Sequence, residues 1–363
     1  MTSADACSIP HPVSAPIVAV RVTNSSAATG EVPYLSTDRT QDDSAIVVRP
    51  VDVADWSDAL QFLFLPFAPA ERESRTQATL KSVAQGSLDL TGLRQAWRAG
   101  QPVGVSLTMQ QPDGVTLVWP PIVAPSAADP DAVFDALVKD VCFRLDAEGA
   151  RLGQVLLDTT DEITRTRLYA AGFTWQTHLF FLVRALGDPL PEDDDTPDWK
   201  AQSYSEATAD RFARLLEATY QGSLDCPWLE GMRTGAEALA SHKLSGRFEP
   251  ECWRIFTSQA ADNGHNDDVA LCLLNDHPDQ DAMEMVYFGV APEYRGQGLG
   301  RALLLDALAR AAQRGRAALF LAVDAQNHYA NSVYANLEFV ELARRTALFR
   351  PPGGGVHESS TGS

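Results

Sequence analysis

The stretch at residues 290–300, Val-Ala-Pro-Glu-Tyr-Arg-Gly-Gln-Gly-Leu-Gly, constrains the fold of this chain more than any other segment. We expect the apolar run at residues 285–290 to form a strand and a helix to begin directly after the stretch. Gly296, Gly298 and Gly300 let the backbone approach a ligand closely, because no Cβ stands in the way. The first N–H groups of a helix have no partners within it and carry partial positive charge. The turn therefore predicts a binding site for an anion such as phosphate or pyrophosphate.

The spacing of these glycines excludes two common nucleotide motifs. A P-loop has lysine followed by serine or threonine after its last glycine, whereas Leu299 precedes and Arg301 follows Gly300 here. A dinucleotide-binding turn has the spacing Gly-x-Gly-x-x-Gly, whereas this chain has Gly-x-Gly-x-Gly. We therefore expect a different anionic ligand.

The arrangement Arg295-x-x-Gly298-x-Gly300 resembles the acyl-CoA signature of the GNAT superfamily of N-acetyltransferases. The resemblance extends over about residues 199–350, and this first signature is its most specific part. A motif match alone is a hypothesis, so a plain glycine-rich connection between a strand and a helix is the alternative.

A second region is similar to the other signature of that family. An apolar stretch at residues 318–323, expected to be a strand, is followed by Asn327, Tyr334 and Phe339 at the family's spacing. Glu338 departs from the pattern, because the family usually has glycine there. We therefore expect the turn before the last strand to differ in shape.

The resemblance implies an α/β fold of two tandem GNAT-like domains, each a mixed β-sheet flanked by helices. It implies acetyl-CoA as the co-substrate and gives no role to a metal. The residues that it implies for cofactor binding are Phe288, Gly289, Val290, Arg295, Gly296, Gln297, Gly298, Leu299, Gly300, Arg301 and Asn327. For Asn327, a cap of the following helix is an equally open interpretation.

Glu284 is the candidate general base. By the resemblance, a glutamate six residues before Val290 deprotonates the acceptor amine, directly or through water. An acid in an apolar strand is costly unless it is paired or useful. The alternative is a paired or edge-exposed glutamate. Strict alternation places its side chain on one face of the strand together with those of Val286, Phe288 and Val290.

Tyr334 is the candidate general acid. It matches the family tyrosine that protonates the departing CoA thiolate, and a phenol can supply that proton when it lies within hydrogen-bond reach. Core packing with a satisfied hydroxyl is the alternative.

The loop beginning at Tyr220 is the candidate acceptor site, because this superfamily commonly shapes its acceptor pocket there. Tyr220 and Asp225 are predicted to bind the acceptor, with a capped turn as the alternative. Cys226 lacks a nearby histidine pattern and is not expected to carry the acyl group. Three histidines of the second half show no metal-ligand spacing and are expected at the surface; they are His242, His265 and His277.

The two halves of the chain look like a tandem duplication, since each repeats the same series of expected strands and helices. After Val-Ala-Pro at residues 123–125, however, the first copy lacks glycines and carries Asp129 and Asp131, which would repel a pyrophosphate. Tyr169 is one residue out of register with Tyr334. We therefore expect a structural or acceptor-shaping first domain. The predicted boundaries are a disordered tail at 1–45 with a possible strand at 17–22, a degenerate GNAT-like domain at 46–186, an acidic linker at 187–198, a catalytic GNAT domain at 199–350 and a flexible tail at 351–363.

Composition excludes some partners. The formal net charge of −19 argues against nucleic acid and anionic membranes, which both require basic surface. Five cysteines without a Cys-x-x-Cys pair suit a reducing compartment. No segment has the roughly 18 apolar residues of a membrane helix, and the start lacks the pattern of a secretory signal, so we expect a cytoplasmic protein.

These observations predict an N-acetyltransferase that moves acetyl directly from acetyl-CoA to a primary amine. The acceptor is expected to be a small-molecule amine or a peptide N-terminus. A non-catalytic acyl-CoA-binding sensor or scaffold is the alternative from another class.

Overall fold

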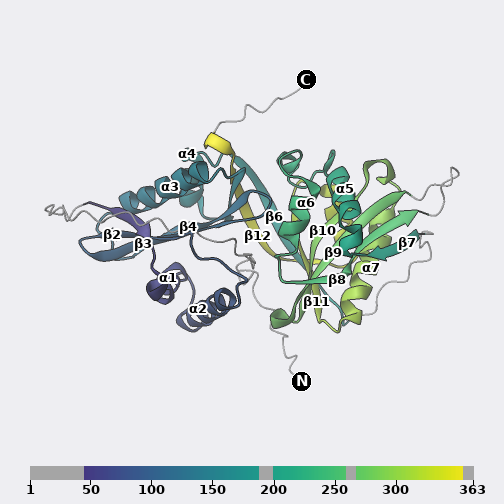
Figure 1. Cartoon of the computed structure of the whole chain (residues 1–363), viewed down its shortest axis with the longest axis horizontal. Helices are drawn as coiled ribbons and strands as arrows, with labels where there is room; N and C mark the ends of the chain where they lie inside the picture. The colour runs from purple at the N-terminus through teal and green to yellow at the C-terminus, as the bar shows by residue number, and fades with distance from the viewer. Residues whose placement is uncertain (1–44, 188–198, 259–266, 355–363) are drawn as a thin grey trace, which may run out of the picture.

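The computed structural model describes residues 45–187, 199–258 and 267–354. Its strands form one continuous twelve-stranded sheet in the order β1-β2-β3-β4-β5-β12-β6-β11-β10-β9-β8-β7, with helices on both faces (Figure 1). From the centre outward, one side of the sheet has β12, β5, β4, β3, β2 and β1, and the other side has β6, β11, β10, β9, β8 and β7. Each side therefore repeats the same series of strands. This agrees with a duplicated α/β architecture.

The first half of the chain contributes one end of the sheet and four α-helices (Figure 1). Its elements are β1 (Val47–Pro50), η2 (Val53–Asp55), α1 (Trp56–Leu63), α2 (Pro69–Ala84), β2 (Leu93–Arg98), β3 (Gln101–Gln110), β4 (Val115–Val123), α3 (Pro130–Ala147), β5 (Leu152–Asp158), α4 (Glu162–Ala170) and β6 (Trp175–Ala185). The helices α1 and α2 lie on one face, and α3 and α4 lie on the other.

The second half repeats this plan. Its elements are β7 (Trp199–Ser203), η3 (Glu206–Thr208), α5 (Ala209–Tyr220), η4 (Pro227–Leu229), α6 (Gly235–His242), β8 (Arg247–Ser258), β9 (Asp268–His277), η5 (Pro278–Gln280), β10 (Ala282–Val290), η6 (Pro292–Tyr294), α7 (Leu299–Gln313), β11 (Ala318–Asp324), α8 (His328–Asn336), β12 (Val340–Arg350) and η7 (Pro352–Gly354). One core fills the face under α7 and α8, and a second fills the face under α5 and α6.

The halves exchange their last strands at the centre of the sheet. The strand β6 of the first half pairs with β11 of the second, and β12 of the second pairs with β5 of the first. The two exchanged strands also pair with each other, and all three ladders are antiparallel. The expected mixed sheets with flanking helices are therefore confirmed, but they join into one sheet. The boundaries at 46–186 and 199–350 stay a prediction.

Some predicted segments lie wholly or partly outside the described residues, including the tail with its possible strand at 17–22 and most of the acidic linker. At the other end, Pro352–Gly354 forms a 3-10 turn, so the start of the expected flexible tail is structured. Among the described helices, none has the length and apolar character needed to cross a bilayer.

Glu338 adopts a backbone φ of +62°, the left-handed region that glycine favours. Gly172, which precedes Phe173 as Glu338 precedes Phe339, has a φ of +96°. The turn therefore keeps a glycine-like conformation in the second half, with some backbone strain, and the expected change of shape was wrong.

Candidate active site

The strands β10 and β11 diverge where the ligand is expected. Their parallel pairing ends at Met285 and Leu321, while β10 continues to Val290 along β9 and β11 continues to Asp324 along β6. In the described structure, the edge of β10 that faces β11 is therefore unpaired beyond Met285. Its backbone N–H and C=O groups can pair with an extended ligand that lies between the strands.

A bulge in β10 corrects one prediction. The register against β9 shifts between Met285 and Tyr287, so strict alternation fails there. Phe288 and Val290 pack in the core under α7 and α8, whereas Val286 packs with Tyr287 in the core under α5 and α6. Phe288 and Val290 therefore lie on the opposite face from Val286.

Gly289 faces α5. A Cβ there would lie 2.7 Å from Thr219 Oγ1 and 2.9 Å from the ring of Tyr287, so only glycine allows this close packing. The glycine of the bulged strand therefore has a packing role besides its predicted place in the cofactor site.

The glycine turn lies between β10 and α7, where the sequence predicts a turn between a strand and a helix. Gly296 and Gly298 have φ values of +76° and +77°, and Gly298 is the N-cap of α7 with no side-chain cap bond. The N–H groups of the first helical turn are therefore not covered by a capping side chain. A Cβ on Gly300 would meet Val333 at 3.6 Å, an ordinary contact, so the third glycine is not required by space.

Arg295 builds the turn rather than pointing freely at a ligand. Its guanidinium donates to the carbonyls of Val290 (3.1 Å), Gln221 (2.6 Å) and Thr219 (2.8 Å). Only part of its hydrogen-bonding capacity remains for a phosphate. Arg301, in the first turn of α7, makes no hydrogen bond or ion pair with another described residue. Its full hydrogen-bonding capacity therefore remains for an anionic ligand.

Three other predicted cofactor residues have local roles. Gln297 donates to the carbonyl of Glu293 (3.2 Å), and Leu299 packs against the core under α7 and α8. The carboxamide oxygen of Asn327 accepts from the N–H of Ala330 (3.2 Å) and so caps α8. The capping interpretation of Asn327 is therefore correct, while any contact of these residues with a ligand stays a prediction.

Tyr334 lies on α8 and is 4% exposed. Its ring packs against Phe339 at a centroid distance of 5.6 Å. Burial, with the Asp225 and Cys272 side chains nearby, raises the pKa of the Tyr334 phenol. The hydroxyl therefore holds its proton at ordinary pH, as a proton donor must before the reaction.

Glu284 is held by two side chains that the sequence did not identify. Its Oε2 accepts from Ser245 Oγ and lies 2.8 Å from His277 Nε2. The Glu284 side chain is 23% exposed and that of His277 is 5% exposed. Glu284 is thus both paired and accessible, which fits either interpretation made from the sequence.

The expected surface location was wrong for two histidines. His277 is buried against Glu284, and burial lowers the pKa of His242 to about 3, with Arg233 reinforcing the effect. The His242 ring lies 5.4 Å from that of Tyr287. The third histidine, His265, lies outside the described residues.

Tyr220 is buried at the end of α5, with 7% exposure. Its hydroxyl accepts from Arg233 Nη2 (2.8 Å), and its ring packs edge-on against that of Tyr287 at 5.7 Å. Burial raises the pKa of this phenol despite the nearby arginine. A direct contact of Tyr220 with an acceptor stays a prediction, and its visible role is to support the loop that follows.

Asp225 is exposed as a residue, but its carboxylate turns inward. Its Oδ1 accepts from the N–H of Asp324 (2.9 Å), a completely buried residue at the end of β11. Desolvation raises the pKa of Asp225 to about 6, and repulsion from the Asp324 carboxylate adds to this, although the hydrogen bond to the Asp324 N–H opposes it. The loop is therefore fastened where β10 and β11 diverge.

Cys226 continues this anchor. Its N–H donates to Asp324 Oδ2 (3.2 Å), and its backbone has a left-handed φ of +47°. One carboxylate oxygen each of Asp225 and Asp324 and the sulfur of Cys226, which are atoms that could bind a metal ion, lie within 4.8 Å of one another. Both aspartates accept backbone N–H bonds, which assigns the group to holding the loop. Burial raises the pKa of the Cys226 thiol, which makes its thiolate scarce.

Comparison with known protein families finds a match in the second half of the chain. Residues 227–339 match the acetyltransferase (GNAT) family. This matched segment lies within the second half and includes β10, the glycine turn and α7, so the second half is similar to GNAT-family acetyltransferases.

Three proteins illustrate what this chain is similar to. A curated relative, the mycothiol acetyltransferase of a Nocardioides species, is 27% identical over 189 residues, which span 46% of this chain and 59% of that protein. A GCN5-related N-acetyltransferase from Sphaerobacter thermophilus superposes with a TM-score of 0.59 at 18% identity, covering 86% of this chain and 98% of the other. A tandem GNAT protein from the clavulanic acid biosynthesis pathway gives a TM-score of 0.51 at 13% identity, covering 86% and 99%. At these identities the two structures show the fold alone.

Proposed function

We propose that this protein is an N-acetyltransferase that moves an acetyl group directly from acetyl-CoA to a primary amine, with its active site in the second half. The observation that carries the proposal is that β10 and β11 diverge beside the uncapped N-terminus of α7, within the segment that matches the GNAT family.

The donor would lie along the unpaired edge of β10. The backbone of Phe288, Gly289 and Val290 offers N–H and C=O groups to the amides of pantetheine. The N–H groups of the glycine turn and the first turn of α7 would bind the pyrophosphate, and Arg301 would add a positive charge. Arg295 would act by fixing the shape of the turn through its three carbonyl contacts.

The chemistry would be one direct transfer. Glu284 accepts a proton from the acceptor ammonium, and the free amine nitrogen attacks the thioester carbonyl carbon. Backbone N–H groups near the bulge of β10 stabilise the oxyanion. The C–S bond then breaks, the Tyr334 hydroxyl protonates the leaving thiolate, and the nitrogen loses its remaining extra proton, which restores the proton of the Tyr334 phenolate directly or through water. The products are the acetamide and free CoA.

Charge on the acceptor side supports a cationic substrate. The Glu284 side chain is 23% exposed and Asp225 lies in the candidate acceptor loop, and carboxylates attract an alkylammonium. The tandem layout and the curated relative make a small-molecule amine of the mycothiol type the first acceptor to test. A peptide N-terminus is the second. We place the reaction in the cytoplasm and assign no nucleic acid or membrane partner.

An activity screen tests the proposal. The purified chain is incubated with acetyl-CoA and a panel of amines, amino sugars and peptides, and thiol release is followed. We expect release that depends on one class of amine and is greatly reduced in Tyr334→Phe. If acetyl-CoA binds by calorimetry but no member of the panel is acetylated, the sensor or scaffold interpretation replaces the enzyme.

A further inference from the structure

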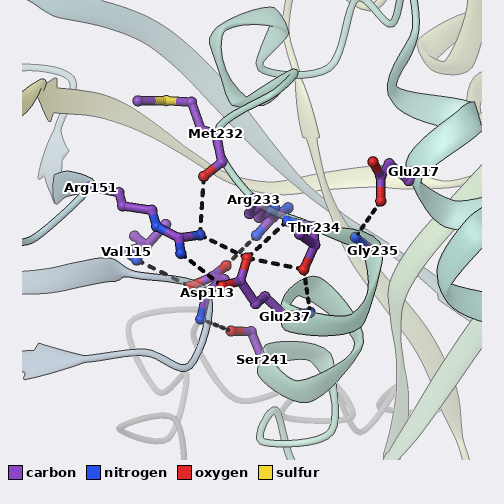
Figure 2. Close-up of polar contacts among 10 residues, drawn as sticks. All are labelled: Asp113, Val115, Arg151, Glu217, Met232, Arg233, Thr234, Gly235, Glu237 and Ser241. Carbon is purple, nitrogen blue, oxygen red and sulfur yellow. Dashed lines mark hydrogen bonds and ion pairs between the residues drawn. The ribbon is translucent and has the colours of Figure 1, made fainter.

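The tip of the β3–β4 hairpin of the first half docks onto the segment between α5 and α6 of the second half, residues 221–234 (Figure 2). Asp113 at this tip forms an ion pair with Arg233 at the end of that segment. The two side chains are 3% and 11% exposed. The N–H of Asp113 also donates to Ser241 Oγ on α6 (3.3 Å).

Arg233 connects the hairpin to Tyr220, the first residue of the candidate acceptor loop. The same guanidinium that binds Asp113 donates to the hydroxyl of Tyr220 (2.8 Å). Tyr220 packs against Tyr287 of β10, and the hydroxyl of Tyr287 lies 2.8 Å from Thr219 Oγ1. A chain of buried contacts therefore connects the first half to the strand that carries Glu284.

The rest of the segment is anchored within the second half. Arg295 holds the carbonyl of Gln221, the carboxylate of Asp225 accepts from the N–H of Asp324, and the carboxylate of Asp324 accepts from the N–H of Cys226.

At the other end of the segment, Arg151 of the first half donates to the carbonyl of Met232 (3.2 Å), and Glu217 accepts from the N–H of Gly235 (2.9 Å). The hairpin binds the side chain of Arg233 between them, through Asp113.

A second contact between the halves is exposed. Arg151 binds Glu237 through two hydrogen bonds of 2.7 and 2.8 Å, and their side chains are 45% and 29% exposed (Figure 2). Exposed pairs contribute little to stability, because water screens them. A buried charged pair, by contrast, strongly disfavours arrangements in which one partner is left alone. The Asp113–Arg233 pair is therefore the stronger determinant of where the segment lies.

We propose that Asp113 is a positioning residue for the acceptor site: by fixing Arg233, it holds Tyr220 and residues 221–234 in the arrangement that binds the amine. This inference rests on the proposed function of the second half. The first half would then contribute to the acceptor site without binding acetyl-CoA itself. Asp113 acts through Arg233 and does not touch the acceptor.

The test compares Asp113→Asn with Asp146→Asn. Asp146 is the control for loss of an ion pair between the halves, because it pairs with Arg350 at 2.7 and 2.8 Å and makes no hydrogen bond or ion pair with residues 221–234 in the part of the chain that the structure describes, although its side chain is 46% exposed. For Asp113→Asn we expect the KM of the acceptor to rise roughly 2- to 30-fold, the range over which coupled residues modulate binding. The Kd of acetyl-CoA should stay within about twofold, and amide hydrogen exchange of residues 221–234 should become faster. Asp146→Asn should leave all three near their wild-type values.

Tyr220→Phe is the second variant in case Asp113→Asn does not fold. It removes only the hydroxyl that Arg233 binds and should also raise the acceptor KM without changing the Kd of acetyl-CoA. Unchanged exchange and KM in the aspartate variant would overturn the proposal, and so would equal effects in the control. Absence of any turnover in the wild-type protein would reject the proposed function alone, because the exchange of residues 221–234 still tests the contact.

Discussion

The two halves of the molecule make the same backbone connections at equivalent positions but differ in the side chains that chemistry needs. In the first half the N–H of Phe173 donates to the carbonyl of Leu168 (3.0 Å), and in the second the N–H of Phe339 donates to the carbonyl of Tyr334 (3.1 Å). Leu168 therefore occupies the place of the candidate acid. Tyr169 is displaced to the surface, with 51% exposure, which confirms the shift of register expected from the sequence.

The base position shows the same loss. Four residue pairs join β4 to β5 in parallel, and four join β10 to β11. The third pair is Leu117 with Gln154 in the first half and Glu284 with Phe320 in the second. A leucine thus stands where the second half has its candidate base.

The helix N-termini differ most. Gly298 caps α7 without a side-chain bond, whereas Asp129 caps α3 by accepting from the N–H of Ala132 (3.1 Å). Pro130 then removes one N–H from the first turn of α3. The fold therefore accepts a helix start with or without a capping side chain. Binding of acetyl-CoA is expected to depend on a few residues placed on this fold.

The largest effect should come from covering the uncapped N-terminus of α7. We expect Gly298→Glu to abolish acetyl-CoA binding measured by calorimetry, because the new carboxylate would cover the free N–H groups and repel pyrophosphate. Gly298→Ala is the control for the left-handed backbone, which costs a residue with a Cβ about 1 kcal/mol. Binding by Gly298→Glu at wild-type affinity would refute the assigned donor site.

The first half allows the reverse experiment. Wild-type protein should bind one acetyl-CoA per chain, and Asp129→Gly should not add a second site. Pro130 still lacks an N–H, and Asp131 still places a carboxylate in the first turn of α3. Two comparable sites in either titration would show that the halves are functionally equivalent.

The next largest effect concerns the acid. Tyr334→Phe should lower kcat by roughly 10²- to 10⁴-fold while the KM of acetyl-CoA changes little, since the hydroxyl acts mainly in the transition state. Tyr169→Phe in the first half is the matched control and should be silent. Steady-state kinetics on the acceptor found by the screen measure both, and equal kcat values for the two variants would remove the role of Tyr334.

A smaller, pH-dependent effect is expected for the base. Glu284→Gln should reduce kcat/KM most at low pH, where little free amine is present, and less as pH approaches the pKa of the amine. Loss of general base catalysis is typically worth roughly 10²-fold or more. A pH profile parallel to that of the wild type would show that Glu284 serves only as the partner of Ser245 and His277.

The sequence predicted the features that depend on neighbouring residues. A few consecutive residues determine each of three such features. They are the glycine turn, the start of α7 and the cap that Asn327 gives α8. The strand exchange was not predicted, since the alternation of β6 and β12 specifies a buried strand but not its neighbours. The position of the bulge in β10 was not predicted, so the faces assigned to Phe288 and Val290 by strict alternation were wrong.

Distant side-chain partners left no pattern in the sequence. Arg295 reaches the carbonyl of Thr219, 76 positions away, and Arg233 reaches Asp113, 120 positions away. The burial of His277 follows from β9 and β10 lying side by side, which its immediate neighbours do not specify. The candidate catalytic and binding roles themselves stay predictions until the variants are measured.

The smallest expected effect compares the pH dependence of stability at two equivalent strand ends: the end of β11, which Asp225 contacts, and the end of β5, which is Asp158. In the second half the pKa of Asp225, beside Asp324 at the end of β11, is raised to about 6, so its ionisation destabilises the folded chain. In the first half Asp158, at the end of β5, accepts hydrogen bonds from Thr160, which lower its pKa. Ionisation of Asp158 therefore stabilises the fold.

The two amide variants should consequently respond with opposite signs. Asp225→Asn should stabilise the protein at pH 7, and the gain should fade as pH is lowered from about 6 to the unfolded value near 4. Asp158→Asn should weaken the protein slightly at pH 7, and its deficit should fade only below about pH 4. Because both residues are exposed, water screens the effects, and we expect at most about 1 kcal/mol for Asp225. Urea unfolding between pH 3.5 and 7.5 measures both, and a gain for Asp225→Asn that grows as pH falls would mean that its carboxylate is not held in the buried arrangement beside Asp324.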